Sequence, residues 1–299
     1  TDLSAGRYTL FVRGQDASGS WGPVSAVFLS VLDSNSPVIE GYVREAGSEV
    51  ALAATVRADV FETQAATSTG YYSMTVLSGT YDLAASLAGY GPSTVSDVVV
   101  SDGETIQQDF SLYPICELFA DDVESGNLGW TAQTPWGITT PIAHSPTHAW
   151  TDSPGGQYSN NRDTSLTSPV WDLSDYTGVE LSFWHRYDLE TGYDYGYVEY
   201  ATDGETWQQL ASYTGYGQTT WRQESFDLAA LDGQTNARVR FRLETDSYVT
   251  ADGWYLDDIV LRGAGVACLP PCAPATITGL TGTTIGMVDE TYRYTATVT

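Results

Sequence analysis

Period-two alternation of apolar and polar side chains is the feature that most constrains the fold of this chain. In the stretch 237–244, "ARVRFRLE", one set of alternate positions is apolar and comprises Ala237, Val239, Phe241 and Leu243. The other set is charged and comprises Arg238, Arg240, Arg242 and Glu244. Successive side chains of a strand point to opposite faces, so one face is expected in a core and one in water. No stretch shows a sustained period of 3.6. The sequence predicts an all-β fold of tandem β-sandwiches.

Turn-forming residues divide the chain into four predicted segments. Residues 1–32 contain two alternating runs around the turn "SGSWG", which predicts a closing β-hairpin. Residues 37–113 contain strand-like runs at roughly the spacing of a β-sandwich. Residues 115–263 form the largest segment, an antiparallel sandwich with an Asp-Gly hairpin signal in "ATDGETW". Residues 275–299 are strand-like as well. Both ends lie in strand-like runs, so we expect an internal piece of a longer polypeptide.

The charge balance argues against two classes of partner. The chain has 299 residues, 38 of them acidic and 12 basic, for a net charge of −26, and every basic residue is Arg. Such a balance repels nucleic acid and anionic membrane surfaces. No apolar run reaches the roughly 18 residues of a membrane span, and no signal peptide is visible. The acidity suits an extracellular surface or one that gathers cations, and it also suits a surface that only keeps the protein soluble.

Three cysteines flank the largest segment. Cys116 stands at its very start, and Cys268 and Cys272 follow it in "CLPPC". If the two ends of this segment meet, Cys116 can form a disulfide with one of the pair, which implies an oxidising compartment. A zinc site of three thiolates is the alternative, but it needs a fourth ligand and no nearby His offers one.

Acidic residues lie at both ends of the largest segment. In "GWYLDDIVL", Asp257 and Asp258 interrupt an apolar strand, and alternation should point them to opposite faces. An unpaired buried carboxylate costs several kcal/mol. In "FADDVESG", Asp122 and Glu124 are two residues apart and share a strand face. If the first and last strands are neighbours, these acids converge, and a cluster of hard oxygen ligands selects Ca²⁺.

Two arrangements without a metal are the alternatives for the acids of the last strand. Asp257 and Asp258 can pair with Arg262 or Arg162, or they can accept hydrogen bonds from backbone N–H groups at a strand end. A melting temperature that does not respond to the removal of calcium would exclude a structural ion of any consequence.

The order of motifs in residues 37–113, "GYV…ALAATV…TSTGYYSMTVLSGTYDLAASLAGY", resembles the carboxypeptidase regulatory-like, transthyretin-type sandwich. The stretch "TGYYSMTVLSGTYDL" is its most specific part, and the resemblance implies a non-catalytic spacer or stabiliser. Residues 1–32 resemble the last two strands of a bacterial immunoglobulin-like domain. Residues 275–299 resemble the opening strands of an immunoglobulin-like or polycystic-kidney-type repeat.

Four motifs in order span nearly all of residues 115–263, namely "FADDVESGNLGW", "HAWTDSPGGQYSNNRDTSLTSPVWDLSDY", "LSFWHRYDLETGYDYGYVEYATDGETW" and "GWYLDDIVL". Together they resemble the jelly-roll module that follows immune inhibitor A metallopeptidases. A similar module appears on other secreted bacterial peptidases and is related in plan to MAM domains. The resemblance implies a calcium-stabilised jelly roll with acidic ligands near its termini. The matching positions are Asp122, Glu124, Asp152, and Asp257 or Asp258.

No catalytic set is visible in the sequence. His144 and His148 are four residues apart in "HSPTH", but Pro146 between them favours a loop, and no Glu accompanies them as in a His-Glu-x-x-His zinc motif. His185 is expected to be a half-buried strand residue, on the face opposite Asp188. No Gly-x-Ser-x-Gly elbow occurs. The sequence therefore predicts no enzyme within these residues.

Aromatic residues support a second function class, carbohydrate binding. Tyr and Trp faces stack on apolar ligand surfaces, and jelly rolls commonly bind glycans with exposed aromatics. The candidates for such a platform are Tyr193, Tyr195, Tyr213, Tyr216 and Trp221. In a β-protein, aromatics also serve as core or sheet-surface residues, which is the alternative.

The expected function is that of a non-catalytic accessory region of a secreted or cell-surface bacterial protein, a peptidase in the first place. Its modules would space, stabilise or dock an upstream catalytic domain of the same polypeptide, with Ca²⁺ as the structural ion. An extracellular protein or glycan is a further expected partner. The alternative is a carbohydrate-binding or adhesive stalk protein with no enzyme attached.

Overall fold

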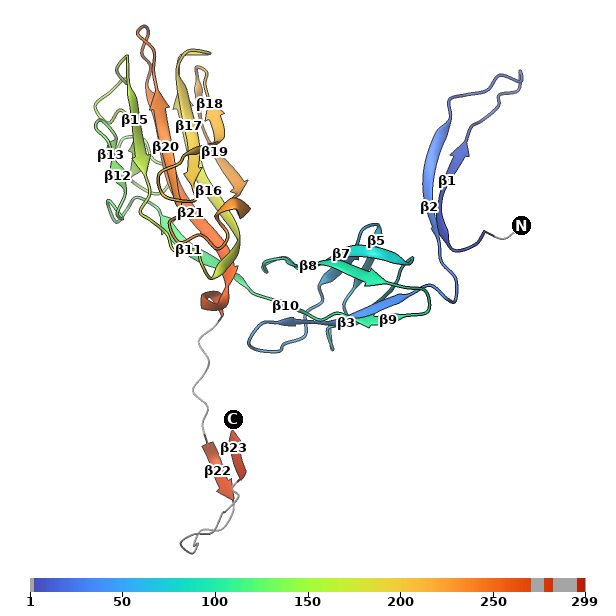
Figure 1. Ribbon diagram of the computed structural model, residues 1–299. Coiled ribbons are helices and arrows are strands. Elements are labelled where there is room, and N and C mark those ends of the chain that lie inside the picture. The colour runs from blue at the N-terminus through green and yellow to red at the C-terminus, as the bar shows by residue number, and fades with distance from the viewer. Residues whose placement is uncertain (1–2, 270–276, 282–294, 299) are drawn as a thin grey trace, which may run out of the picture. The chain divides into compact units, whose positions relative to one another are not determined.

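The computed structural model of the protein describes residues 3–269, 277–281 and 295–298, which consist mainly of β-strands and their connections (Figure 1). The helical elements in these ranges are two 3-10 turns, η1 (Ala229–Leu231) and η2 (Val266–Cys268). The predicted all-β fold of β-sandwiches is confirmed. In the described part of the chain, no helix has the length and hydropathy needed to span a membrane.

The first element pair is an antiparallel hairpin of β1 (Gly6–Val12) and β2 (Ser25–Val31). Gly6 lies opposite Val31, and Val12 lies opposite Ser25. Its apolar side chains are largely exposed, with Phe28 at 85%. The expected hairpin is present, and its assignment to an immunoglobulin-like domain stays a prediction.

Residues 38–112 form two four-stranded sheets, which we call the small sandwich. One sheet has the order β10 (Phe110–Leu112), β3 (Val38–Glu45), β6 (Tyr71–Thr75), and β9 (Thr105–Gln107) also pairs with β3. The other has the order β5 (Phe61–Gln64), β4 (Thr55–Ala58), β7 (Gly79–Ser86), β8 (Ser93–Val100). Ile39 and Tyr72 of the first sheet share one core with Val56 and Leu83 of the second.

Residues 115–265 form two larger sheets, which we call the large sandwich. The six-stranded sheet has the order β13 (Gly137–Thr139), β14 (Ala149–Thr151), β21 (Gly253–Gly265), β16 (Tyr176–Asp188), β19 (Gln218–Asp227), and β11 (Ile115–Asp121) also pairs with β21. The five-stranded sheet has the order β12 (Thr131–Ala132), β15 (Asp163–Thr167), β20 (Arg238–Glu244), β17 (Tyr195–Ala201), β18 (Gln208–Tyr213).

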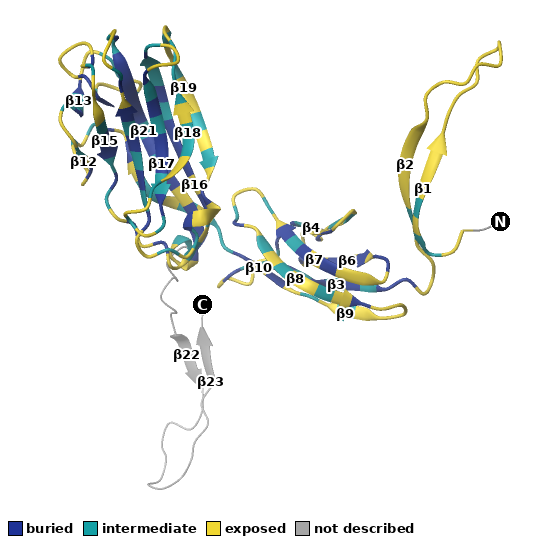
Figure 2. Cartoon of the chain, turned by 45° about the horizontal axis from the view of Figure 1, so that its top comes forward, coloured by how far each residue is buried: buried dark blue, intermediate teal, exposed yellow. Residues whose placement is uncertain are grey.

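The alternation in β20 produces the predicted two faces. Val239 and Phe241 are fully buried, and each such side chain contributes about 1.5–3 kcal/mol relative to its exposed state. On the other face, Arg240 Nε donates to Glu199 Oε2 at 2.6 Å, and Arg242 Nε donates to the same oxygen at 3.2 Å. The core also takes in the central strand β21, which is buried along most of its length (Figure 2).

The first and last strands of the large sandwich are neighbours, as predicted. β11 pairs antiparallel with the C-terminal half of β21, with Asp121 opposite Ile259. Cys116 forms a disulfide with Cys268, with 5.4 Å between the Cα atoms. The prediction that Cys116 bridges one of the two later cysteines is confirmed, and Cys272 lies outside the described residues.

In the last segment, β22 (Ile277–Thr281) and β23 (Thr295–Val298) pair antiparallel. Contacts along the chain separate residues 1–268 from residues 269–299 as two compact units. The further predicted boundaries, at 1–32, 37–113, 115–263 and 275–299, stay predictions, and most of the last range lies outside the described residues.

Candidate metal and ligand sites of the large sandwich

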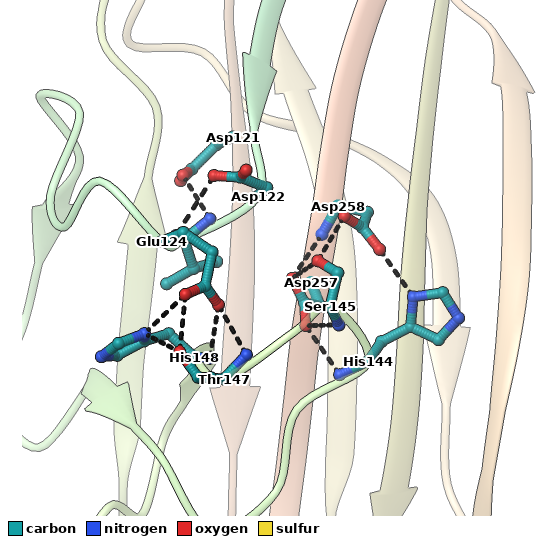
Figure 3. A network of polar contacts seen from close by, with 10 residues as sticks. Asp121, Asp122, Glu124, His144, Ser145, Thr147, His148, Asp257 and Asp258 are labelled. Carbon is teal, nitrogen blue, oxygen red and sulfur yellow. Dashed lines mark hydrogen bonds and ion pairs between the residues drawn. The ribbon is translucent and has the colours of Figure 1, made fainter.

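Asp257 is fully buried, and backbone N–H groups satisfy its charge (Figure 3). Its Oδ2 accepts from the N–H of His144 at 2.7 Å and of Ser145 at 2.9 Å, and its Oδ1 accepts from the N–H of Asp258 at 2.8 Å. Burial raises the pKa of Asp257 above its ordinary value, and the three N–H donors oppose this rise. The arrangement is the expected alternative in which a buried carboxylate at the strand accepts backbone hydrogen bonds.

Asp258 reaches the same loop as Asp257, although strict alternation predicted opposite faces. Ser145 Oγ lies 3.2 Å from Asp257 Oδ1 and 2.6 Å from Asp258 Oδ1. The expectation of opposite faces is wrong because the register between β16 and β21 shifts between Ser182 and Trp184, and Asp258 has a positive φ of 47°. An extra residue in one strand re-aims its side chains in this way.

Glu124 holds the other end of the same loop, residues 144–148, which we call the histidine loop. Its carboxylate accepts from Thr147 N–H at 2.8 Å, Thr147 Oγ1 at 2.6 Å and His148 N–H at 2.7 Å. The Thr147 hydroxyl is the largest of the influences that lower the pKa of Glu124 to about 2. The histidine loop is therefore held by acids from both ends of the large sandwich (Figure 3).

The burial and hydrogen bonds of Asp121 and Asp122 differ from the sequence prediction. Asp122 is exposed, and its Oδ1 accepts only from Glu124 N–H, at 3.1 Å, among the hydrogen bonds of the described residues. Asp121 is 1% exposed and accepts from Trp150 Nε1–H at 3.1 Å and Val123 N–H at 2.9 Å. The sequence prediction chose Asp122, and the buried member of the pair is Asp121.

Asp152 directly follows β14 and is fully buried. It is not one of the acids that accept hydrogen bonds from the histidine loop. Its Oδ1 accepts from Trp254 N–H at 2.6 Å, and its Oδ2 has no hydrogen-bond partner in the described part of the chain. Burial raises the pKa of Asp152 to about 7, and the nearby charge of Asp252 adds to the rise. A Cβ on Gly253 would lie 2.7 Å from Asp152 Oδ1, so the close approach of the carboxyl group requires this glycine.

The five predicted calcium ligands are not gathered into one site. The oxygens of Glu124 and Asp257 accept hydrogen bonds from N–H groups of the histidine loop. The described residues contain one group of at least three acidic, His or Cys side chains with ligand atoms close enough for an ion, and none of the five belongs to it. Arg262 pairs with Glu117 at 2.9 Å rather than with the acids of β21. Calcium at the five positions stays a prediction.

That one group consists of Glu190, Asp194 and Asp246, which we call the acidic triad. Its ligand oxygens all lie within 4.8 Å of one another, which is about twice a Ca–O distance of 2.3–2.6 Å. Asp194 is fully buried and accepts from Tyr158 O–H at 2.5 Å and Asp246 N–H at 2.8 Å.

Glu190 is the member of the acidic triad that lacks a donor. Its Oε2 is buried and has no hydrogen-bond partner among the residues that the structure describes. Burial raises the pKa of Glu190, and the charges of Asp246 and Asp194 raise it further. Three carboxylates that repel one another, with one oxygen unsatisfied, are suited to a divalent cation.

Sequence reasoning missed the acidic triad because its members come from two connections far apart in the chain. Glu190 and Asp194 lie between β16 and β17, and Asp246 lies between β20 and β21. The available signal was positional: each acid lies within two residues of a strand end and next to turn residues, in "DLETGYDYG" and "LETDSY". Only the pairing of β17 with β20, in which Tyr195 lies opposite Glu244, brings the two connections to one end.

The five aromatic residues of the predicted glycan platform lie on different surfaces. Tyr213 packs inward, with its ring centroid 4.4 Å from that of His185 and 5.8 Å from that of Trp254. Tyr195 stacks on Tyr197 at 5.8 Å. The expectation of a single platform is therefore wrong in its membership.

The three other candidates are Trp221, Tyr193 and Tyr216. Trp221 faces the ring of His144 with 5.6 Å between centroids. Tyr193 and Tyr216 are exposed, at 64% and 48%. These two alone among the five are free for a ligand in the described structure.

The histidines fill structural roles in the described part of the chain. His144 stacks on Trp184 at 3.9 Å, and its Nδ1 lies 2.6 Å from Asp258 Oδ2. His185 is 1% exposed rather than half-buried, and its Nδ1 accepts from Trp254 Nε1–H at 3.2 Å. Burial lowers the pKa of His185 to about 4, so it stays neutral.

Comparison with known proteins identifies one curated relative that supports a link to peptidases. The chain is 34% identical over 152 residues to Bacillopeptidase F of Bacillus subtilis, an alignment that covers 48% of this chain and 10% of that protein. The chain thus spans about a tenth of the length of this relative. No family model matches the sequence.

Solved structures with a similar fold include adhesin and carbohydrate-binding domains. The K3 cleaved adhesin domain of Lys-gingipain from Porphyromonas gingivalis is 20% identical, covers 50% of this chain and 98% of its own, and gives a TM-score of 0.38. The xylan-binding domain of carbohydrate-binding family 22 is 13% identical, covers 50% and 96%, and gives a TM-score of 0.36. At these values the likeness carries no argument about what this chain binds.

Proposed function

We propose that this chain is a non-catalytic accessory region of a secreted bacterial peptidase. The large sandwich serves as spacer, stabiliser or docking module for a catalytic domain upstream in the same polypeptide. The observation that carries this proposal is the 34% identity over 152 residues with Bacillopeptidase F. The disulfide between Cys116 and Cys268 supports an oxidising, extracellular or cell-surface location.

The family assignments form part of the same proposal. Residues 115–263 would be a jelly roll of the immune inhibitor A type, and residues 37–113 a carboxypeptidase regulatory-like sandwich. The four ordered motifs of the large sandwich, and the adjacency of its first and last strands, support the first assignment.

An activity assay tests the non-catalytic role. The chain as it stands, incubated with casein in calcium-containing buffer, should release peptides at the rate of the buffer blank. Sustained turnover that survives repurification, and that scales with the concentration of the chain, would overturn the proposal.

We further propose that the structural calcium ion binds at the acidic triad. The support is the 4.8 Å limit on the separation of the ligand oxygens and the unsatisfied Oε2 of Glu190. An ion in this place would relieve the mutual repulsion of three carboxylates, one of them fully buried. It would also tie the β16–β17 connection to the β20–β21 connection.

A thermal melt with and without calcium tests this site. Saturating calcium should raise Tm by several degrees over the value in EGTA, since a ligand at a hundred times its Kd stabilises by about 2.7 kcal/mol. Glu190→Gln keeps the shape but removes the charge, and it should abolish the shift.

The matched control for the calcium experiment is Glu124→Gln, which changes a predicted ligand at the histidine loop. This variant should keep the calcium-dependent rise in Tm. The opposite result, with the rise kept in Glu190→Gln and lost in Glu124→Gln, would place the ion among the originally predicted ligands. If calcium does not raise the Tm of the unsubstituted protein, the proposal of a structural calcium ion is wrong.

Carbohydrate binding is the second candidate function, and the exposed tyrosines favour it. Tyr193 and Tyr216 are 64% and 48% exposed, and Tyr248 is 73% exposed. Exposed aromatic rings on a rigid sandwich supply stacking surface at low entropic cost. An accessory region that binds a glycan would hold its attached enzyme near a polysaccharide-rich surface.

A further inference from the structure

Three exposed tyrosines belong to the connections next to the acidic triad, namely Tyr193, Tyr216 and Tyr248, and we call them the tyrosine rim. Tyr193 and Tyr248 are connected to it through the backbone: Tyr193 N–H donates to Glu190 O at 3.3 Å, and Tyr248 N–H donates to Asp246 Oδ1 at 2.8 Å. Tyr216 N–H donates to Oγ1 of Thr191, the residue that follows Glu190, at 3.3 Å. The rim residues come from three separate connections, between β16 and β17, β18 and β19, and β20 and β21.

Two oxygen atoms at this end of the sandwich have no donor within the described ranges. One is Glu190 Oε2, and the other is Oδ1 of Asn160, and both are buried. The amide of Asn160 donates to Ser247 O at 3.1 Å, and the neighbouring Asn161 N–H donates to Asp246 O at 2.6 Å. A neutral amide oxygen beside the acids is thus unsatisfied as well. Buried acceptors without donors are rare, and a water, an ion or a ligand hydroxyl can satisfy them.

The electrostatics of this end select the class of ligand. The three carboxylates oppose an anionic ligand. A divalent ion in the acidic triad neutralises two of the three negative charges, which weakens the attraction for a cationic ligand. Neutral ligands with several oxygen atoms remain the best match.

An ion held by the acidic triad would have coordination positions left for such a ligand. Ca²⁺ takes six to eight oxygen ligands, whereas Asp194 already accepts bonds from Tyr158 and from Asp246 N–H. Glu190 and Asp246 are only partly buried, so water or ligand oxygens can reach an ion held between them. Two adjacent hydroxyl groups of a sugar can replace two waters at the distances that calcium requires.

We propose that this end of the large sandwich binds a neutral glycan, with vicinal sugar hydroxyls on the calcium ion and sugar faces against Tyr193, Tyr216 and Tyr248. This inference rests on the proposed calcium site and names its ligand class. It replaces the five-residue platform expected from the sequence with a smaller site that includes Tyr248.

Affinity electrophoresis with mannan and galactan tests the inference. In calcium the protein should be retarded by at least one of the two polysaccharides, and EGTA should abolish the retardation. The same polysaccharides after periodate oxidation and borohydride reduction have lost their vicinal diols, and they should not retard the protein. Each of Tyr193→Ala, Tyr216→Ala and Tyr248→Ala should weaken binding roughly two- to tenfold.

Controls separate the glycan inference from the calcium proposal. The three tyrosine variants should keep the calcium-dependent rise in Tm, because none of them changes an acidic ligand. Tyr195→Ala, on the outer face of the five-stranded sheet, should bind glycan as the unsubstituted protein does.

Four outcomes would overturn the inference. The first is that neither mannan nor galactan retards the protein in calcium, and the second is that retardation persists in EGTA. The third is that the periodate-treated polysaccharides retard the protein. The fourth is that Tyr195→Ala loses binding while the rim variants keep it. A calcium-dependent rise in Tm without glycan retardation would leave the ion in place and remove only the glycan.

Discussion

The carboxyl group of Asp152 is fully buried, and one of its oxygens has no hydrogen-bond partner among the described residues. Its pKa is raised from 3.8 to about 7 in the folded protein. An acid whose folded pKa lies above its unfolded value is preferentially protonated in the folded state. Its contribution to stability is therefore complete below pH 3.8 and is lost as the pH rises through about 7.

Substitution of Asp152 by Asn should remove this dependence on pH. The amide oxygen can still accept from Trp254 N–H, and the side chain no longer ionises. We expect the variant to be more stable than the unsubstituted protein at pH 8, by at most about 4 kcal/mol, with the difference shrinking towards pH 4. Thermal melts across this pH range measure it. Asp122→Asn, a change of the same kind on an exposed side chain, should follow the unsubstituted protein, and equal profiles for all three proteins would contradict the assignment.

At the histidine loop, the sequence did not predict the roles of the individual acidic residues. The sequence predicts that Glu124 shares a strand face with Asp122, but β11 ends at Asp121, and Glu124 accepts from the N–H groups of Thr147 and His148 in the loop. Asp122 was chosen over Asp121, although Asp121 is the buried one. Two adjacent acids differ in burial only through the local path of the backbone, and Val123 between the acids at 122 and 124 has a positive φ of 61°.

At the scale of elements, the start of β21 depends on Gly253. Its φ is +106°, and an added Cβ would lie 2.5 Å from Ser153 Oγ and 2.7 Å from Asp152 Oδ1. Both the backbone conformation and the close approach favour glycine.

Gly253→Ala should therefore destabilise the large sandwich by about 1–3 kcal/mol. The midpoint of unfolding in urea, followed by tryptophan fluorescence, measures the change. Gly155→Ala is the matched control, since a Cβ there meets nothing within 4 Å. Equal midpoints for the two variants would show that the contact with Asp152 imposes no constraint.

Element types followed from the sequence, and their irregularities did not. The alternation of residues 237–244 predicted β20 and both of its faces, because side-chain period is a local property of a strand. The same rule failed for Asp257 and Asp258, where the register shifts against β16. A bulge is imposed by the partner strand, and the alternating pattern of one strand does not encode it.

At the scale of the whole molecule, the disulfide between Cys116 and Cys268 closes a loop with a sequence separation of 152 residues. Its two cysteines flank the large sandwich, where β11 already lies beside β21. A cross-link over so long a loop restricts the unfolded chain strongly, and loss of a native disulfide typically costs about 2–5 kcal/mol.

The double variant Cys116→Ala/Cys268→Ala should lower the Tm of the large sandwich accordingly. Reduction of the unsubstituted protein should produce the same drop, and reductant should leave the Tm of the double variant unchanged. A double variant that melts at the temperature of the oxidised protein would show that strand pairing alone holds the two ends together.

The sequence by itself determined the all-β class, the two faces of β20, the meeting of the first and last strands, and the bond from Cys116 to one of the later cysteines. These features depend on local period and on residues that lie close to the ends of one segment. The tertiary structure alone decided which acids share a site. Glu190 and Asp194 are separated from Asp246 by about fifty residues of chain, and the pairing of β17 with β20 brings their connections together. Strand order in a sheet is a long-range property, and the alternating pattern of single strands leaves it open.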